Sequence, residues 1–123
     1  MPKYYIYILT NKSNKVLYTG MTDNLCRRVL EHALKINEGF TNRYNVDKLV
    51  YFEEFEKSEE AAKRERQIKA GTRKKKIELI DRMNSDWHDL YHEICSDDEG
   101  YEIASLLPAA GRSLAIKKAG GVH

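Results

Sequence analysis

The chain has 123 residues, of which 33% are charged and 41% hydrophobic, and its formal net charge is +2. This length suits one ordinary domain and is short for two. No apolar run approaches the about 20 residues of a membrane-spanning helix, and a tyrosine-rich strand pattern stands where a secretory segment would begin. We therefore expect a globular, cytoplasmic protein without membrane contact. Cys26 and Cys95 are far apart and lack metal-ligand spacing, so both are expected to be reduced and structurally incidental.

Three segments have the pattern of β-strands. Residues 4–10 are aromatic and β-branched, and after a polar, Asn-rich loop residues 16–20 resume the pattern. Two such runs around a polar loop predict a β-hairpin. Residues 48–55 are the third candidate. The predicted fold class is α/β of the α+β kind, a small three-stranded antiparallel sheet flanked by helices, because a sheet this small needs at least one covered face.

Four helices are expected, and the first two follow from apolar periodicity and capping residues. Thr22 or Asp23 can cap the first helix, which is expected to run to about Asn37. Ser58 can cap the second, which is expected to run through Lys69.

The two remaining helices are shorter. Thr72 can start the third after Gly71, with Ile77, Ile80 and Met83 facing inward. The fourth is a short helix with an acidic cap and several apolar or aromatic side chains. These residues are Asp86 as the cap, followed by Trp87, Leu90, Tyr91 and Ile94.

The chain is expected to divide into one folded domain and a tail. Residues 1–95 carry nearly all the strand and helix patterns. Residues 96–100 are an acidic break, and residues 109–123 are rich in Ala, Gly and Lys with little to pack. We expect residues 96–123 to be a mostly flexible C-terminal tail.

The net charge conceals an uneven distribution. Eight basic residues between Lys63 and Lys76 stand against Glu65 alone, which leaves a local charge of +7. A solvated helix face is the commoner meaning of such a run. Neutralisation of nucleic-acid phosphates is the alternative, and it depends on the rest of the site.

Three features could carry chemistry, and each also has an ordinary structural explanation. Arg28 and His32 are four apart on the first helix, hence side by side at the rim of its apolar face. Glu65 falls among apolar positions of the second helix, where a carboxylate needs a salt bridge or a bound cation such as magnesium. Tyr7 and Tyr18 lie on the two arms of the hairpin, where aromatic residues usually pack but buried hydroxyls need hydrogen-bond partners.

The order and spacing of these residues resemble the GIY-YIG nuclease domain. The resemblance rests on Tyr5-Ile6-Tyr7, then Tyr18-Thr19-Gly20, then Asn24-Leu25 with Arg28, Val29 and His32. Two later segments, residues 40–51 and 64–69, look like the small stand-alone bacterial branch often called YhbQ-like. The similarity covers roughly residues 3–94.

The resemblance implies a role for particular residues. Arg28 would stabilise charge on the scissile phosphate, Glu65 would bind one Mg²⁺ or Mn²⁺, and Tyr7, Tyr18 and His32 would complete the catalytic set. Asn84 would support the site, and Tyr44 would replace a histidine of some relatives. The basic residues expected to contact nucleic acid are Arg27, Arg43, Lys69, Arg73 and Lys74.

Three functional hypotheses follow. The first is a metal-dependent endonuclease that hydrolyses DNA phosphodiesters in repair or processing, with structure specificity or weak sequence specificity, and with RNA as a further substrate class to consider. The second is a non-catalytic nucleic-acid-binding module on the same scaffold. The third is a subunit that contacts a protein partner through its C-terminal tail.

Overall fold

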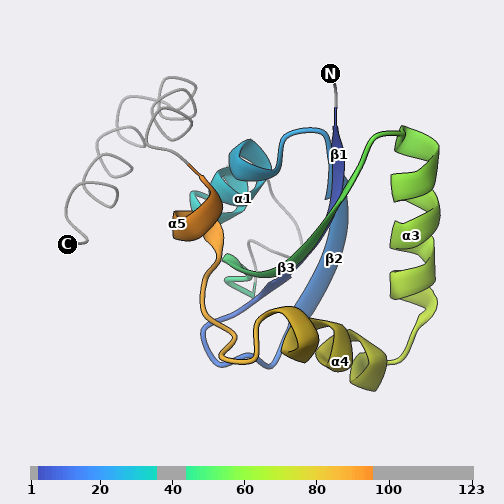
Figure 1. Ribbon diagram of the computed structural model, residues 1–123. Coiled ribbons are helices and arrows are strands. Elements are labelled where there is room, and N and C mark those ends of the chain that lie inside the picture. The colour runs from blue at the N-terminus through green and yellow to red at the C-terminus, as the bar shows by residue number, and fades with distance from the viewer. Residues whose placement is uncertain (1–2, 36–43, 96–123) are drawn as a thin grey trace, which may run out of the picture.

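The computed structural model describes residues 3–35 and 44–95, so the expected tail and Arg43 lie outside the described residues. Three strands, β1 (Tyr4–Thr10), β2 (Leu17–Thr22) and β3 (Lys48–Phe55), form an antiparallel sheet in the order β2-β1-β3 (Figure 1). The predicted fold class is confirmed, and β1 and β3 have the predicted bounds, whereas β2 begins one residue later and ends two residues later than the predicted 16–20.

Helices cover both faces of the sheet, although the sequence required only one covered face. On one face lie α3 (Ser58–Ala70) and α4 (Arg73–Met83), and on the other lie α1 (Leu25–Ala33) and α5 (Tyr91–Ile94) (Figure 1). The middle strand therefore has no solvent side, and its residues 6–10 are all buried. A strand covered on both faces is apolar throughout rather than alternating.

Two hydrophobic clusters hold these layers together. The cluster under α3 and α4 comprises Ile6, Ile8, Val50, Tyr51, Ala61, Ile68 and Ile80. The cluster under α1 and α5 comprises Tyr7, Leu9, Leu25, Val29, Val46, Leu49 and Leu90. Tyr7 thus belongs to the core that α1 covers.

The first helix begins later and ends earlier than predicted. Its cap is Asn24, whose Oδ1 accepts from the Arg27 N–H at 3.1 Å, so neither Thr22 nor Asp23 is the cap. Thr22 acts one step earlier, since its Oγ1 accepts from the Asn24 N–H at 3.1 Å. The helix ends at Ala33, and Lys35 has a left-handed φ of 56°, which is not helical. The predicted end, Asn37, lies outside the described residues.

The next two helices agree with the predictions except at single residues. Lys57 is the N-terminal cap of α3 and makes no side-chain capping bond, so Ser58 is the first helical residue and not the cap. Thr72 caps α4 as predicted, with its Oγ1 accepting from the Lys75 N–H at 3.1 Å. Ile80 is fully buried, but Met83 is 47% exposed and does not face the core.

The last predicted helix is reduced to one turn. Trp87 has a φ of 54°, which is incompatible with a helix starting at Asp86. Asp89, which the sequence analysis did not single out, accepts from the backbone N–H of Tyr91 at 3.0 Å and of Leu49 at 3.2 Å. It therefore ties the first residue of α5 to β3. Ile94, at the end of this turn, is 39% exposed.

The two cysteines form a disulfide, which corrects the expectation of two incidental thiols. Cys26 lies in the first turn of α1 and Cys95 follows α5, and their Cα atoms are 5.6 Å apart. Separation along the sequence hid this proximity, because only the packing of α1 against α5 brings the residues together. Separately, among the described residues every helix is too short or too polar to cross a membrane.

Reduction of this disulfide should destabilise the domain. The bond closes a loop with a sequence separation of 69, and such a cross-link typically adds about 2–4 kcal/mol to the free energy of unfolding. We expect dithiothreitol to lower the melting temperature of the wild type. The double variant Cys26→Ser/Cys95→Ser should melt at the lower temperature with or without reductant. A wild-type melting temperature that is the same with and without dithiothreitol would contradict this expectation.

Candidate active site

Three aromatic side chains from three elements meet on the α1 side of the sheet. Tyr7 comes from the middle strand, Tyr18 from β2 and His32 from α1, and their ring centroids are separated by 6.4 Å (Tyr7–Tyr18), 6.0 Å (Tyr7–His32) and 5.6 Å (Tyr18–His32). Tyr7 is 1% exposed and His32 is 5% exposed. The structure thus brings together three of the residues that the sequence proposed as catalytic.

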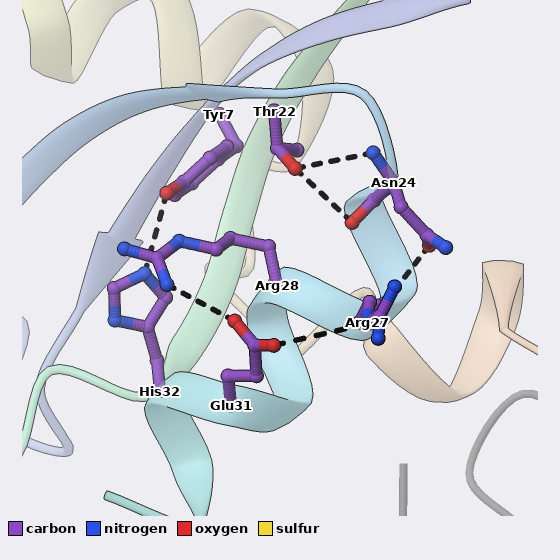
Figure 2. A network of polar contacts seen from close by, with 7 residues as sticks. All are labelled: Tyr7, Thr22, Asn24, Arg27, Arg28, Glu31 and His32. Atoms are coloured by element: carbon purple, nitrogen blue, oxygen red, sulfur yellow. Dashed lines mark hydrogen bonds and ion pairs between the residues drawn. The ribbon is translucent and has the colours of Figure 1, made fainter. Parts of the chain in front are cut away.

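A hydrogen bond joins two of these rings. The Tyr7 hydroxyl lies 3.2 Å from Nε2 of His32 (Figure 2). Gly20 is the β2 residue paired with Tyr7, and a Cβ atom at Gly20 would lie 2.4 Å from the Tyr7 hydroxyl oxygen. The absent side chain at Gly20 therefore leaves the space that the Tyr7 ring occupies.

Substitution of Gly20 tests this close approach. We expect Gly20→Ala to lower the free energy of unfolding by about 1–3 kcal/mol, because the new methyl group overlaps a ring that is fixed in the core. Gly71→Ala is the matched control, since a Cβ there would meet nothing nearer than 3.4 Å. Urea denaturation of both variants measures the difference. Equal stability of the two variants would show that the Tyr7 ring is free to move.

Arg28 lies beside the Tyr7–His32 pair and is held from the other side by an acidic residue. Its Nη1 donates to Oε1 of Glu31 at 3.0 Å, and Oε2 of the same carboxylate lies 3.8 Å from Nε of Arg27 (Figure 2). The Arg28 side chain retains 31% exposure, so part of the guanidinium can reach a ligand. Its planar fork of donors suits a phosphate group.

The surroundings shift the pKa values of both members of the hydrogen-bonded pair. Burial raises the pKa of Tyr7 to about 12, with contributions from Tyr18 and Glu65, while the hydrogen bond and charge of Arg28 act in the opposite direction. Burial, followed by the charge of Arg28, lowers the pKa of His32 to about 4. Near neutral pH the phenol is therefore protonated and the imidazole is neutral.

The lowered pKa of His32 predicts acid sensitivity of the fold. Between the unfolded pKa of 6.5 and the folded pKa of about 4, the unfolded chain binds a proton that the folded chain does not. Stability should therefore fall as the pH falls through this window, by up to about 3 kcal/mol from this residue. Urea denaturation at pH 7, 5.5 and 4.5 should show a smaller loss for His32→Gln than for the wild type. The exposed His92→Gln control should behave as the wild type, and a His32→Gln loss as large as the wild-type loss would contradict the assignment.

Glu65 lies on a partly buried flank of α3. Its side chain is 21% exposed, and Oε2 lies 3.2 Å from Nζ of Lys69. The salt bridge that the sequence left open as an alternative is therefore present. Its negative charge is also among the causes that raise the pKa of Tyr7, which places the carboxylate within electrostatic reach of the tyrosine–histidine pair. An ion pair one helical turn apart is worth only about 0.3–0.5 kcal/mol, so a cation can replace Lys69 readily.

The donor set around Glu65 fits a cation that the substrate helps to bind. Within residues 3–35 and 44–95 there is no group of three or more His, Cys, Asp or Glu residues that could hold a metal ion. Mg²⁺ is commonly held by one or two carboxylates, with water and substrate phosphate as the other ligands. A single carboxylate whose charge is felt at Tyr7 is consistent with that arrangement.

The two residues predicted to support the site have different surroundings. Asn84 is 4% exposed, and all its side-chain bonds go to backbone groups: Nδ2 donates to Val50 O at 3.2 Å and His88 O at 2.8 Å, and Oδ1 accepts from His88 N at 3.3 Å. It fixes the segment after α4 to β3. Tyr44 is 43% exposed.

The residues predicted to bind nucleic acid are partly engaged within the protein. Arg27 and Lys69 form the ion pairs with Glu31 and Glu65 described above. Arg73 Nη2 donates to the Asn14 carbonyl at 3.4 Å, and Lys74 is exposed.

Sequence reasoning missed Glu31, the residue that positions Arg28. It is three residues after Arg28 and four after Arg27, and oppositely charged side chains at these spacings are neighbours on a helix. That signal was available in the sequence. It carries little weight alone, because most such pairs are exposed and contribute little.

The fold and the site define a small α+β domain with a tyrosine–histidine–arginine cluster, in which Glu31 holds the arginine and the charge of Glu65 acts on Tyr7. A family model described as the GIY-YIG catalytic domain matches residues 3–78, and the chain belongs to this family. Membership of this family indicates nuclease activity. The resemblance stated from the sequence motifs is confirmed.

Several relatives carry the designation UPF0213, which states no activity. The chain is 45% identical over 76 residues to UPF0213 protein CPE1444 of Clostridium perfringens, covering 62% of this chain and 81% of the relative. It is 39% identical over 80 residues to UPF0213 protein SSP2268 of Staphylococcus saprophyticus, covering 65% and 96%. The solution NMR structure of UPF0213 protein BH0048 from Bacillus halodurans is 28% identical and covers 76% of this chain and 99% of that one, with a TM-score of 0.47.

Proposed function

We propose that this protein is a divalent-metal-dependent endonuclease that hydrolyses DNA phosphodiester bonds. The observation that carries the proposal is the Tyr7–His32 hydrogen bond beside Arg28, with the charge of Glu65 felt at Tyr7. Phosphodiester hydrolysis needs an oriented water, a cation opposite the developing negative charge, and stabilisation of the leaving oxygen. These residues supply groups for each requirement, and family membership supports the assignment.

Arg28 would bind the scissile phosphate. Its Nη1 donates to Glu31 and the guanidinium also hydrogen-bonds to Tyr7, and its other donors are available for phosphate oxygens. Because Glu31 fixes the guanidinium before the substrate arrives, little reorganisation is needed as negative charge develops in the transition state.

Tyr7 and His32 would orient the water and receive its proton. With a pKa of about 12, the Tyr7 phenol stays protonated and accepts a proton only if it passes its own to His32 Nε2. Part of the lowering of the His32 pKa comes from Arg28, and a bound phosphate would offset that charge. Substrate binding therefore favours proton transfer from water through the Tyr7 oxygen to Nε2. Tyr18, in ring contact with both residues, would complete the pocket around the water.

Glu65 would hold Mg²⁺ or Mn²⁺ when the substrate is bound, and such an ion supplies charge stabilisation to the phosphate and the leaving oxygen. In exchange, Lys69 would be released to the nucleic-acid backbone. A domain of this size has room for few base contacts, so we propose structure specificity or weak sequence specificity and a role in DNA repair or processing.

A cleavage assay tests the proposal. Branched, nicked, single-stranded and duplex DNA, and RNA counterparts, are incubated with the full chain and Mg²⁺ or Mn²⁺, with a chelator as control. We expect metal-dependent cleavage of at least one DNA substrate. Binding without cleavage on every substrate and with both metals would overturn the enzyme assignment and favour the non-catalytic module.

A further inference from the structure

A surface pocket is lined by residues of α3, of α4 and of the turn between them. Figure 1 shows the corner at which these two helices meet. The volume of the pocket is about 240 Å³, and its apolar lining residues are Ile68 and Leu79. The remaining lining is strongly basic. We call it the α3–α4 basic pocket, and its positively charged residues are Arg64, Lys75, Lys76 and Arg82.

Most of this positive charge is not neutralised within the protein. Arg64 is engaged, since its Nε and Nη2 donate to Glu53 at 3.0 Å each. Among the described residues, Lys75, Lys76 and Arg82 take part in no ion pair. Glu78 is the only acidic residue among those that line the pocket in the described part of the chain. A ligand in this pocket would meet an excess of positive charge.

The placement of these lysines works against helix stability. The first turn of α4 contains no acidic residue and carries basic side chains, including Lys75. A helix dipole disfavours cations at this end. Folding alone therefore does not account for the arrangement, whereas an anion bound between the two helices would.

The pocket is separate from the candidate active site. Successive residues of a helix are rotated by about 100°, so Glu65 lies on one side of the buried Ile68 and Arg64 lies on the other. A phosphate in the pocket is therefore not the phosphate beside Glu65. Glu65 and Ile68 are nevertheless only about 4.5 Å apart along the helix axis, so one nucleic-acid molecule can reach both places.

We propose that the α3–α4 basic pocket binds a backbone phosphate of the nucleic acid outside the cleaved bond. Small-molecule sites usually occupy about 300–1,000 Å³, and this smaller, basic pocket suits one charged group of a larger ligand. The substrate is then held at two points, one on each flank of α3. The inference rests on the proposed function only in that the ligand is a nucleic acid.

The test is DNA binding by the full chain in the presence of a chelator, measured by fluorescence anisotropy over a range of salt concentrations. The pocket variant is Lys75→Gln/Lys76→Gln/Arg82→Gln. The control variant, Lys12→Gln/Lys57→Gln/Lys63→Gln, removes the same charge from exposed positions outside the pocket. Each lost phosphate contact should reduce the slope of log K against log salt by about 1.

We expect the slope to fall by about 1 for the pocket variant, because one phosphate contact is lost, and to change by much less for the control. A second variant, Gln67→Glu, adds one negative charge at an exposed lining position and should weaken binding even if the triple variant folds poorly. Equal slopes for the pocket and control variants, with no effect of Gln67→Glu, would overturn the inference.

Combining the binding test with the cleavage assay shows whether the pocket proposal or the nuclease proposal has failed. If the wild type cleaves DNA and both triple variants give equal slopes of log K against log salt, the pocket is not a phosphate site and the nuclease assignment is retained. If only the pocket variant loses binding and the wild type does not cleave, the phosphate site is supported and the nuclease assignment is wrong.

Discussion

Arg28→Ala should lower the single-turnover rate of DNA cleavage by about 10²–10³-fold, the usual effect of removing one preorganised group that stabilises transition-state charge. The guanidinium lies beside the Tyr7–His32 pair and is held by Glu31, so its loss removes the phosphate-binding charge and leaves the rings in place. Arg28→Lys should restore only part of the rate, because an ammonium group keeps the charge but not the two-pronged geometry.

Arg27→Ala is the matched control for this prediction. Arg27 is adjacent in sequence, bonds to the same Glu31 carboxylate and has a 49% exposed side chain, but it does not take part in the Tyr7–His32 cluster. We expect weaker DNA binding and a rate at saturating DNA within a few-fold of the wild type. If Arg28→Ala cleaves at the wild-type rate, or if Arg28→Ala and Arg27→Ala lower the cleavage rate equally, Arg28 does not have the proposed role. Thermal melting of each variant checks that the fold is intact.

Glu65→Gln should have the second large effect. It should change both the rate of DNA cleavage and the metal concentration that cleavage requires. Loss of a metal-supported stabilisation of several kcal/mol corresponds to about 10²–10³-fold or more in rate. The metal concentration for half-maximal cleavage should rise, because the amide is a weaker ligand than the carboxylate. Glu60→Gln, at an exposed position on the same helix, should change neither quantity.

An independent measurement accompanies this variant. The charge of Glu65 is among the causes that raise the pKa of Tyr7, so Glu65→Gln should lower the Tyr7 pKa in a spectroscopic titration without metal or DNA. Lys69→Gln should act oppositely to Glu65→Gln on metal binding, since it frees the carboxylate from its ion pair. Wild-type metal dependence in Glu65→Gln would remove Glu65 from the metal site.

Local features of the sequence were sufficient for the strands and for most helix positions. Residues 4–10, 16–20 and 48–55 are strongly strand-forming, and Thr72 is a local cap for α4. The cap of α1 was missed because three adjacent residues, Thr22, Asp23 and Asn24, are all capable of capping. Only the backbone path, with Thr22 bound to the Asn24 N–H, selects among them.

The candidate catalytic residues were found by order and spacing, but their mutual geometry was not. Tyr7, Tyr18 and His32 are far apart in sequence, and strand pairing together with the docking of α1 brings their rings into contact. The ion pair of Glu65 was harder to predict from the sequence. Whether Glu65 contacts Lys69 depends on side-chain orientation, which sequence spacing only permits.

The fold class, the order of elements and the residues of the cluster could be predicted from the sequence, because they follow from local propensity and motif spacing. Three features appear only in the folded domain: helices cover both faces of the sheet, Cys26 meets Cys95, and basic residues of α4 line a pocket together with α3. Each depends on contacts between segments distant in sequence, and such contacts are set by packing in the whole domain rather than by any local pattern.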